Sequence, residues 1–384
     1  MNATTDITYS PKDYKSDQYV RWCPGCGDHA VLSCLHKAMA EVGTSPDNMA
    51  VISGIGCSSR LPYYMNTYGF HTIHGRGAAI ATGVKTARPD ISVWLVTGDG
   101  DCLAIGGNHF IHAVRRNVDL NVVLMNNKIY GLTKGQYSPT SDRGFVSKSS
   151  PYGTVEDPFV PAELTLGARG NFFARGIDTD AANLTAIFAA SARHRGTAVT
   201  EVLVNCVIFN NGTHTGITDR EVRAERSIFL RHGEKMIFGK NRDKGLVLDG
   251  LKLKAVTIGE DGYTMNDILV HDAHERDNTL HLMLAMMNGD MPVALGIIRD
   301  VDAPTYEESP LAARHVALWR HLGGEVTPTL ARSHDSSCVH KKESPADRIC
   351  SVGLFAFQDR ETSLAGRMGT CLTIPFPPAA LWIG

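Results

Sequence analysis

Short apolar runs and helix-like segments alternate in the first part of the chain. Two of the runs, ISVWLVT (91–97) and LNVVLM (120–125), flank a helix-like segment. The first run ends in the polar, turn-forming residues GDGD, and the second ends in NN. Two buried parallel strands joined by a crossover helix have this pattern. It therefore predicts an α/β fold with a mostly parallel sheet flanked by helices.

Further strands and helices are predicted on both sides of this unit. AVISGIG (50–56) is expected to form a buried strand, and TAVTEVLVN (197–205) the last strand of the domain. Helix-like segments are expected around 161–169 and 180–195. Upstream, Asp28 is expected to be the N-cap of a helix, and the apolar stripe of that helix would consist of Ala30, Val31, Leu35, Ala38 and Met39.

Changes in character along the sequence divide the chain into four parts. These are a flexible arm (1–20), the main domain (21–220), a C-terminal extension (221–330) and an irregular or disordered tail (331–384). Within the extension we expect a hairpin over 245–261, a short helix over 277–290, a strand over 291–301 and a helix over 303–324. The extension is expected to pack on the core or on a partner.

Asp99 and Asn127 follow the two apolar runs and are candidates for one shared site. In parallel sheets, ligands bind outside the carboxyl ends of the strands. Both side chains offer hard oxygen ligands, and Mg²⁺ prefers a couple of these together with phosphate oxygens. Gly98 and Gly100 remove side chains where a backbone must approach a phosphate. GDG, with NN placing Asn127 28 residues after Asp99, resembles the diphosphate-binding motif of thiamine-diphosphate enzymes.

Two further polar stretches have the composition of a functional site. The glycines of His74-Gly75-Arg76-Gly77 allow a tight turn into a helix of small residues. The N-terminus of that helix and Arg76 would suit an anion. Residues 133–160 are rich in Gly, Ser, Pro and Lys, and we expect them to form a long functional loop over the site.

The charge balance and the apolar runs exclude several classes of partner. Lys plus Arg (38) nearly balances Asp plus Glu (40), so the net charge implies no polyanionic partner such as nucleic acid. The N-terminus is polar and lacks the apolar region of a signal peptide. No apolar run approaches the length of a membrane span. We therefore expect a soluble, cytoplasmic protein without a membrane partner.

The chain has 9 cysteines, an odd number, spread widely, which disfavours a disulfide framework. Cys23-Pro-Gly-Cys26 is compatible with a thioredoxin-like redox pair, half of a zinc site or half of an iron–sulfur site. The preceding QYVRW is a weak strand for a redox pair, and a zinc ribbon would need a second CxxC. Cys57 and Cys206 follow predicted strands and could complete a set of four thiolates. Cys34 and Cys102 are expected to be packing residues.

Six motifs together carry a family resemblance. In chain order they are CPGCGDHAVL, GIGCSSR, HGRGAAIATG, GDGD, NN and IYGLTKGQYSPTS. With these motifs, residues 18 to about 215 closely resemble the β subunit of 2-oxoacid:ferredoxin oxidoreductases. The resemblance implies a thiamine-diphosphate-binding fold, Mg²⁺ and one [4Fe–4S] cluster. It covers the segment after 221 only loosely and the last 50 or so residues not at all.

The resemblance also implies which residues form the site. The cluster ligands would be Cys23, Cys26, Cys57 and Cys206. Magnesium would be held by Asp99, Asn127 and the main-chain carbonyl of Ile129. Thiamine diphosphate would lie against Ile55, Gly56, Cys57, Ser58, His74, Gly75, Arg76, Gly77, Gly100, Asp101, Gly131 and Leu132. Arg60 falls where this family places a cation for the substrate carboxylate.

The implied reaction is the oxidative decarboxylation of a 2-oxoacid, with coenzyme A as acyl acceptor and ferredoxin as electron acceptor. The family's activating glutamate has no candidate in this chain, so an α (or fused γα) subunit is expected to complete the site. GLTKGQ and SPTS look like the members that use 2-oxoglutarate, and Lys134 could pair with a second carboxylate. Pyruvate or a broad range of 2-oxoacids remains an alternative. So do a non-redox thiamine diphosphate enzyme and a zinc-stabilised interaction subunit without chemistry of its own.

Overall fold

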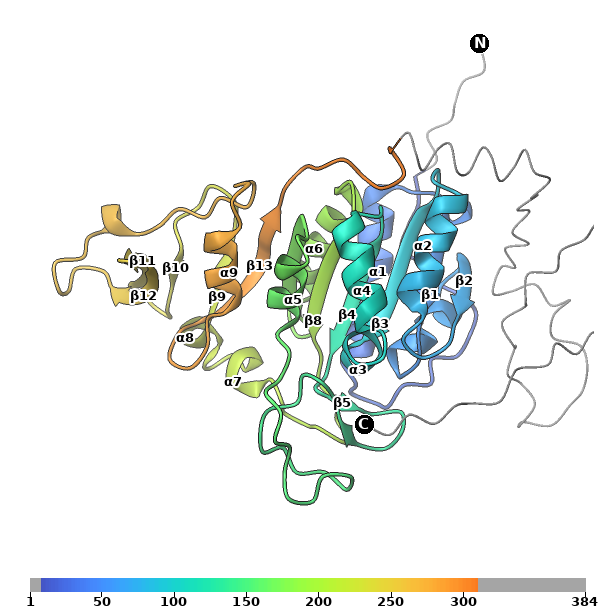
Figure 1. The fold of residues 1–384 in the computed structure, drawn as a ribbon, viewed down its shortest axis with the longest axis horizontal. Coiled ribbons are helices and arrows are strands. Elements are labelled where there is room, and N and C mark those ends of the chain that lie inside the picture. Colours follow the sequence, from blue (N-terminus) through green and yellow to red (C-terminus); the bar gives the residue numbers. More distant parts are fainter. Residues whose placement is uncertain (1–7, 310–384) are drawn as a thin grey trace, which may run out of the picture. The chain divides into compact units, whose positions relative to one another are not determined.

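The computed structural model describes residues 8–309, and these residues form an eight-stranded sheet (Figure 1). Its strand order is β2-β1-β3-β4-β8-β7-β13-β9. Neighbouring strands from β2 to β7 are parallel. β13 pairs antiparallel with β7 and parallel with β9. The strands are β1 (Met49–Ser53), β2 (Tyr68–His71), β3 (Ser92–Gly98), β4 (Asn121–Asn126), β7 (Phe172–Ile177), β8 (Ala198–Leu203), β9 (Ser227–Leu230) and β13 (Val293–Asp300).

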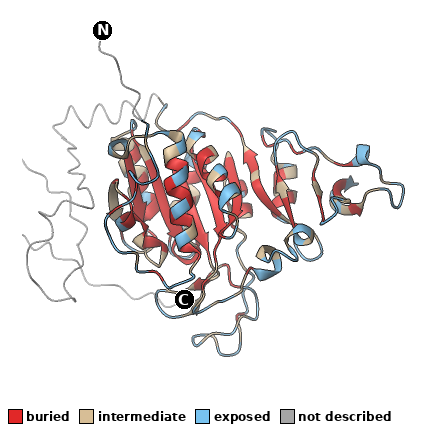
Figure 2. Ribbon diagram, turned by 180° about the vertical axis from the view of Figure 1, so that it is seen from behind, coloured by how far each residue is buried: buried red, intermediate tan, exposed pale blue. Residues whose placement is uncertain are grey.

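Helices cover both faces of this sheet, so its central strands are buried on both sides (Figure 2). Along β3, Val93 and Leu95 pack in the core that includes α2, α4, α5 and α9. Trp94 and Val96 point the other way, into the core that includes α1 and α6. The helices are α1 (Asp28–Val42), α2 (Gly77–Ala87), α3 (Asp99–Leu103), α4 (Gly107–Arg116), α5 (Pro161–Gly167), α6 (Ala181–Arg193), α7 (Thr215–Thr218), α8 (Arg223–Arg226) and α9 (Thr279–Ala285).

Two smaller sheets and three 3₁₀ turns complete the described part. One sheet has the order β10-β11-β12, and the other pairs β5 with β6. Their strands are β5 (Ile129–Tyr130), β6 (Gln136–Tyr137), β10 (Ile237–Phe238), β11 (Lys244–Asp249) and β12 (Lys252–Thr257). The turns are η1 (Pro46–Asn48), η2 (Ser58–Tyr64) and η3 (Met265–Asp267). The β5–β6 hairpin begins the loop that follows β4.

Most of the elements predicted from apolar patterning are confirmed. The four predicted strands of the main domain correspond to β1, β3, β4 and β8, and the two predicted helices after the loop correspond to α5 and α6. The hairpin of the extension forms as β11 and β12. The predicted short helix and the strand after it correspond to α9 and β13. Cys34 and Cys102 are buried, as expected of packing residues.

The prediction of a flexible arm over 1–20 is wrong for residues 8–20. Tyr14 is completely buried, and its hydroxyl donates to the carbonyls of Met39 and Thr44. Ser16 is also buried, and its hydroxyl donates to the Tyr63 carbonyl. A polar sequence with few apolar residues gives no periodic signal, so the packing of a single tyrosine escaped prediction.

Asp28 is not the N-cap of α1. It is the first residue of the helix, Gly27 occupies the cap position, and no side-chain cap hydrogen bond forms there. Asp28 is 2% exposed and its Oδ2 has no hydrogen-bond partner. Its carboxyl group is therefore not satisfied by the backbone of the helix, although an acid at this position is what a capping pattern would predict.

The sheet does not end with β8, because it continues across the predicted boundary at residue 220. β9 and β13 come from the extension and add two strands beyond β7. β7 itself was not predicted, since its sequence FFARGI holds a charged residue and a glycine. The helix predicted over 303–324 does not form over 303–309, and the rest of it lies outside the described residues, as does the tail 331–384. No helix within residues 8–309 has the length and apolarity needed to cross a bilayer.

Candidate active site

A cavity of about 430 Å³ opens where β1, β3 and β4 end, which is the sheet edge that the sequence predicted. Most of the residues expected to touch a cofactor or the magnesium ion line it. These are Ile55, Gly56, Cys57, Ser58, His74, Asp99, Gly100, Asp101, Asn127, Ile129, Gly131 and Leu132. Gly98, expected to let the backbone approach a phosphate, also lines the cavity, and the lining residues that the sequence analysis did not assign to the site are Asp28, Met125, Tyr130, Thr133 and Gln136.

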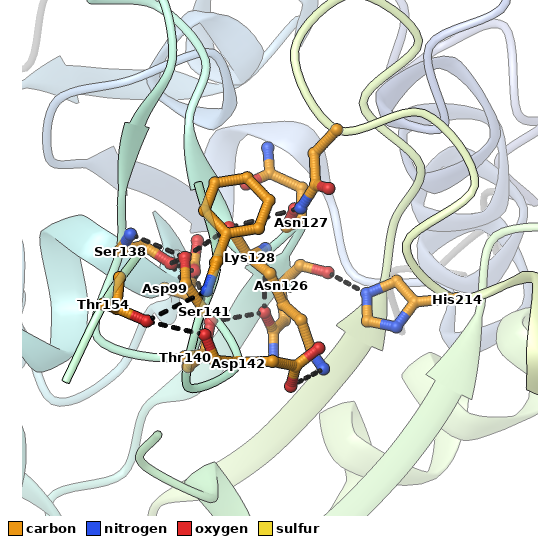
Figure 3. Close-up of polar contacts among 12 residues, drawn as sticks. Asp99, Asn126, Asn127, Lys128, Ser138, Thr140, Ser141, Asp142, Thr154 and His214 are labelled. Atoms are coloured by element: carbon orange, nitrogen blue, oxygen red, sulfur yellow. Dashed lines mark hydrogen bonds and ion pairs between the residues drawn. The ribbon is translucent and has the colours of Figure 1, made fainter. Parts of the chain in front are cut away.

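Asp99 is one of the buried carboxylates that line this cavity (Figure 3). It begins α3 directly after β3. Its Oδ2 accepts hydrogen bonds from the Ser138 hydroxyl and, at 2.6 Å, from the Thr140 hydroxyl. Burial raises the pKa of Asp99, and the two hydroxyls act in the opposite direction. A nearby cation would compensate for the desolvation that raises this pKa.

The oxygen donors around Asp99 fit a magnesium ion bound to a diphosphate. Asp99, Asn127 and Ile129 line the same cavity, and the Asn127 Oδ1 accepts from the Ile129 backbone N–H at 3.1 Å. The backbone at Gly100 is in close contact with Tyr130, since a Cβ there would lie 2.2 Å from the tyrosine ring. Tyr130 also donates its hydroxyl to the Gly100 carbonyl at 3.0 Å. Glycine is therefore required at position 100 for the lining to form.

Asp101 ties three separate segments of the cavity lining together. Its Oδ1 accepts from the backbone N–H of Ile55 at 3.0 Å and of Gly75 at 2.7 Å. The same oxygen lies 3.0 Å from His74 Nδ1, and Oδ2 accepts from the Thr97 hydroxyl at 2.7 Å. Asp101 is 3% exposed. The sequence analysis assigned Asp101 to cofactor contact, and the structure adds this bridging role.

The HGRG motif contributes mainly through its turn. His74 lines the cavity, whereas Gly75, Arg76 and Gly77 do not. Gly75 has φ +70°, and a Cβ there would lie 2.6 Å from the Gly106 backbone nitrogen. Arg76 is exposed, and its Nη1 lies 2.7 Å from His109 Nε2. A Cβ at Gly77 would lie 2.7 Å from Leu95, so close packing explains both glycines, and the contact of Arg76 in this structure is with His109.

The two side chains expected to bind substrate carboxylates lie beside the cavity and do not line it. Arg60 is half-buried on η2 and close enough to Cys57 for its charge to lower the pKa of that thiol. Lys134 is exposed in the turn between β5 and β6 and has φ +80°. A side chain that does not line the cavity in this structure would have to turn, or the loop to move, before it could contact a ligand.

Of the four candidate cluster thiols, Cys57 lines the cavity and the other three lie near it. A Cβ at Gly131 would lie 3.5 Å from Cys206 Sγ and 3.6 Å from Cys57 Sγ, so both sulfurs face the same backbone position. Burial, then Asp28, Cys206 and Cys23 raise the pKa of Cys57 to about 12. Burial and Asp28 also raise the pKa of Cys26, and Cys57 adds to this shift. The other three thiols therefore lie close enough to Cys57 to interact with it electrostatically.

This thiol set has the donors of a cubane cluster. A [4Fe–4S] cluster binds each cysteine through a different iron, so its ligands surround a shared volume and need not converge on one ion. Within residues 8–309, no group of three or more His, Cys, Asp or Glu side chains could hold a single metal ion. Gly131 leaves room next to two of the sulfurs, which suits a cluster between them.

Asp28 was assigned only a structural role from the sequence, yet it lines the cavity beside the thiols. Burial raises the pKa of Asp28 to about 7. Its position two residues after Cys26 in the CPGCGD stretch is the signal that could have flagged it from the sequence. Ser138 and Thr140 gave no comparable signal, because their contact with Asp99 depends on how the loop folds back.

Comparisons with known proteins agree with this geometry. Residues 54–202 match the model of the thiamine pyrophosphate enzyme C-terminal TPP-binding domain. The chain is 48% identical over 321 residues to the 2-oxoglutarate oxidoreductase subunit KorB of Mycobacterium tuberculosis, covering 82% of this chain and 85% of that protein. It is 46% identical over 198 residues to a 2-oxoacid:ferredoxin oxidoreductase subunit beta of Aeropyrum pernix, covering 52% of this chain and 62% of that protein.

A solved structure shares the fold. The 2-oxoglutarate:ferredoxin oxidoreductase of Magnetococcus marinus, determined with 2-oxoglutarate, coenzyme A and succinyl-CoA bound, superposes with a TM-score of 0.65 and 31% identity. The match covers 88% of this chain and 96% of that chain. The high identity over most of a curated relative, together with the matched domain model, decides the family. The chain belongs to the family of 2-oxoacid:ferredoxin oxidoreductase β subunits.

Proposed function

We propose that this β subunit catalyses the coenzyme A-dependent oxidative decarboxylation of 2-oxoglutarate to succinyl-CoA and passes the electrons through a [4Fe–4S] cluster to ferredoxin. The observation that carries the proposal is the position of Cys57. It lines the same cavity as Asp99 and Asn127. A Cβ at Gly131 would lie 3.6 Å from its sulfur and 3.5 Å from that of Cys206, so the two sulfurs face the same point of the backbone. One residue would therefore border both the thiamine diphosphate and the cluster.

The reaction balances with these components. The bond between the 2-oxo carbon and the carboxylate breaks and CO₂ leaves, while the acyl carbon forms a bond to the coenzyme A sulfur. The thiol proton is released, and two electrons reduce two ferredoxins; a cluster, when bound by the four cysteines, would supply the one-electron carrier. Thiamine diphosphate, when bound, supplies the electron sink for the cleaved bond.

The residues of this chain would have distinct roles in that reaction. Asp99, Asn127 and the Ile129 carbonyl would hold Mg²⁺ and through it the diphosphate. Cys23, Cys26, Cys57 and Cys206 would bind the cluster. Arg60 would bind the 1-carboxylate of the substrate with its planar guanidinium, and Lys134 the distal carboxylate that distinguishes 2-oxoglutarate from pyruvate.

Two further parts of the proposal concern the assembly and its compartment. The glutamate that activates the cofactor in this family would come from an α (or fused γα) subunit. Within residues 8–309, the carboxylates that line the cavity are Asp28, Asp99 and Asp101. The cysteines of the described residues are all free thiols, which supports a reducing, cytoplasmic location.

The substrate assignment rests on the relatives named for 2-oxoglutarate and on the neighbour solved with 2-oxoglutarate and succinyl-CoA. The test is anaerobic co-purification with the partner subunit, followed by kcat/KM for 2-oxoglutarate, pyruvate and other 2-oxoacids with coenzyme A and oxidised ferredoxin. We expect a clear preference for 2-oxoglutarate. We also expect the purified protein to be brown and to absorb at about 400 nm. Pyruvate as the preferred substrate would refute the substrate assignment, and colourless zinc protein would refute the redox role.

A single substitution tests the basis of that preference. Lys134→Met should lower kcat/KM for 2-oxoglutarate and leave that for pyruvate unchanged, because pyruvate has no second carboxylate. Lys148→Met, in the same loop, serves as the control for loss of a positive charge. Equal losses with both acids in Lys134→Met would remove Lys134 from substrate choice and leave the rest of the proposal standing.

A further inference from the structure

The segment Ser138–Thr140 of the loop after β4 contacts Asp99, the charged ligand proposed for the magnesium ion. The hydroxyls of Ser138 and Thr140 both donate to Asp99, and both side chains are 2% exposed (Figure 3). Loops seldom bury hydroxyl side chains unless these have partners. Here both partners are the same carboxylate, which is also the charged ligand proposed for the cation.

The two hydroxyls approach Asp99 from the loop and not from the cavity. Both take the same oxygen, Oδ2. Asp99 lines the cavity, whereas Ser138 and Thr140 do not. The two hydroxyls thus hold the carboxylate from the loop, and the carboxylate, although only 2% exposed, borders the cavity.

The segment is fixed from the loop side as well. The Ser138 backbone N–H donates to the Ser141 hydroxyl at 2.8 Å, and that hydroxyl donates to the Lys128 carbonyl at 2.7 Å. These bonds join the loop to the residue that follows Asn127. The same short segment is therefore connected to both halves of the proposed cation site.

A buried hydrogen-bond network connects Asn126 to two further strands of the sheet. The Thr140 hydroxyl has one proton to donate, and the carboxylate, at 2.6 Å, takes it in preference to Asn126 Oδ1 at 2.9 Å. The Asn126 amide donates to Glu201 at 2.8 Å, and Glu201 accepts from Arg175 at 2.7 Å. Asn126, Glu201 and Arg175 lie on β4, β8 and β7, which are neighbours in the sheet.

His214 adds a contact from the other side, since its Nε2 lies 2.9 Å from the Asn126 carbonyl. In Figure 3 the histidine and the loop hydroxyls lie on opposite sides of Asn126. Asn126 directly precedes Asn127 in the chain. Its position, and with it the start of the turn that carries Asn127, is thus defined by contacts with the Lys128 backbone N–H, with the sheet and with the segment after β8.

We infer that Ser138 and Thr140 are positioning residues of the magnesium site, which fix the orientation of the Asp99 carboxylate toward the cation. This inference rests on the proposed function, because it presupposes that Asp99 binds the ion. It also links the loop to the cofactor. Since Thr133 and Gln136 of the same loop line the cavity, a cation held by Asp99 would stabilise the loop, and a fixed loop would favour the cation by the same free energy.

The test measures Mn²⁺ affinity, with Mn²⁺ as a paramagnetic substitute for Mg²⁺. The full chain, co-purified with its partner subunit and supplied with thiamine diphosphate, is titrated with Mn²⁺ and the free ion is followed by electron paramagnetic resonance. Thr140→Val keeps the shape and removes the hydroxyl, so we expect Kd to rise about tenfold, the change for loss of one hydrogen bond to a charged group. Ser138→Ala should raise it similarly. Thr140→Ser restores the donor and should stay within about twofold of wild type.

Thr154→Val is the matched control. Thr154 is a buried threonine of the same loop, and its hydroxyl donates to the Asp142 carbonyl without contacting Asp99. Its Kd should equal that of wild type. Unchanged affinity in both Thr140→Val and Ser138→Ala overturns the inference, as does tighter Mn²⁺ binding, which would mean that the hydroxyls compete with the ion. If Thr140→Val does not fold, Ser138→Ala and Thr140→Ser decide the question.

One further variant separates this inference from the proposed function. Asp99→Ala should abolish the cofactor-dependent Mn²⁺ binding seen in wild type. If wild type and Asp99→Ala bind alike, the proposed cation site is wrong and the inference falls with it. If Asp99→Ala loses the ion while the hydroxyl variants keep it, only the positioning role is refuted.

Discussion

Removal of the Asp101 side chain should destabilise the protein more than removal of an exposed aspartate. Asp101 accepts hydrogen bonds from Ile55, Gly75 and Thr97 and is almost fully buried. In Asp101→Ala all three donors lose their acceptor. Each buried donor left unsatisfied costs about 1–3 kcal/mol, and water entering from the adjacent cavity would partly replace the carboxylate. We expect a total loss of roughly 3–5 kcal/mol, in the range found when one member of a buried charged network is removed.

Asp101→Asn should be milder, by an argument from hydrogen-bond inventory. The asparagine oxygen can still accept from the two backbone N–H groups, and the Thr97 hydroxyl can turn and accept from the amide. What remains is the difference between a charged and a neutral acceptor, about 1–2 kcal/mol. The order of stability is therefore wild type, then Asp101→Asn, then Asp101→Ala.

The assay is urea unfolding of the full chain, followed by circular dichroism and analysed for both the midpoint and the slope. Asp90→Ala is the control, because Asp90 is exposed and pairs with Arg88 at the surface; it should cost less than about 1 kcal/mol. A loss in Asp101→Ala no larger than that of Asp90→Ala would show that the three segments do not depend on this carboxylate. The bridging role would then be wrong.

Three further predictions concern the thiols, the substrate and acid stability. Anaerobically purified protein should carry about four irons per chain; Cys206→Ser should lose most of them and Cys34→Ser none, and equal iron in the two variants would contradict the ligand set. Arg60→Met should lower kcat/KM for every 2-oxoacid by roughly 10- to 150-fold, the equivalent of about 1.5–3 kcal/mol, with Arg60→Lys in between; unchanged values would place Arg60 outside the site. Burial lowers the pKa of His36 to about 4. As pH falls, the unfolded chain therefore takes up a proton at His36 before the folded protein does, and the free energy of unfolding should drop by roughly 3 kcal/mol between about pH 6.5 and 4. Urea unfolding should show a smaller drop in His36→Gln, and an equal drop would refute the role of His36 in acid stability.

The sheet edge could be predicted from the sequence because it depends on local patterns. Asp99 and Asn127 each follow an apolar run, and the carboxyl ends of neighbouring parallel strands meet. Nothing more than strand identity and direction was needed to bring these residues together. Cys57 follows the same rule after β1, and Cys206 after β8.

β7 could not be predicted because its burial depends on a partner elsewhere in the chain. Arg175 lies in the middle of the strand and is 6% exposed. Its guanidinium pairs with Glu201 of the neighbouring strand and donates to the Ala294 carbonyl of β13. A buried arginine is tolerated only when such partners are present, and a single-sequence pattern cannot show them. The same holds for Ser138 and Thr140, which need Asp99 to explain their burial.

The strand order explains why the candidate cation ligands and the candidate cluster ligands share one cavity. The order β1-β3-β4-β8 places the segments after these strands at one edge of the sheet, so the segments that carry Cys57, Asp99, Asn127 and Cys206 meet there. In the sequence, however, Cys206 lies far from the other three residues. The turn after β4 supplies Asn127 and Ile129 on one side and lies against both sulfurs at Gly131 on the other. A shift of this turn would therefore move the cation site and the cluster site together. A parallel sheet with this strand order would thus place the proposed thiamine diphosphate and the proposed cluster next to each other without any dedicated connecting domain.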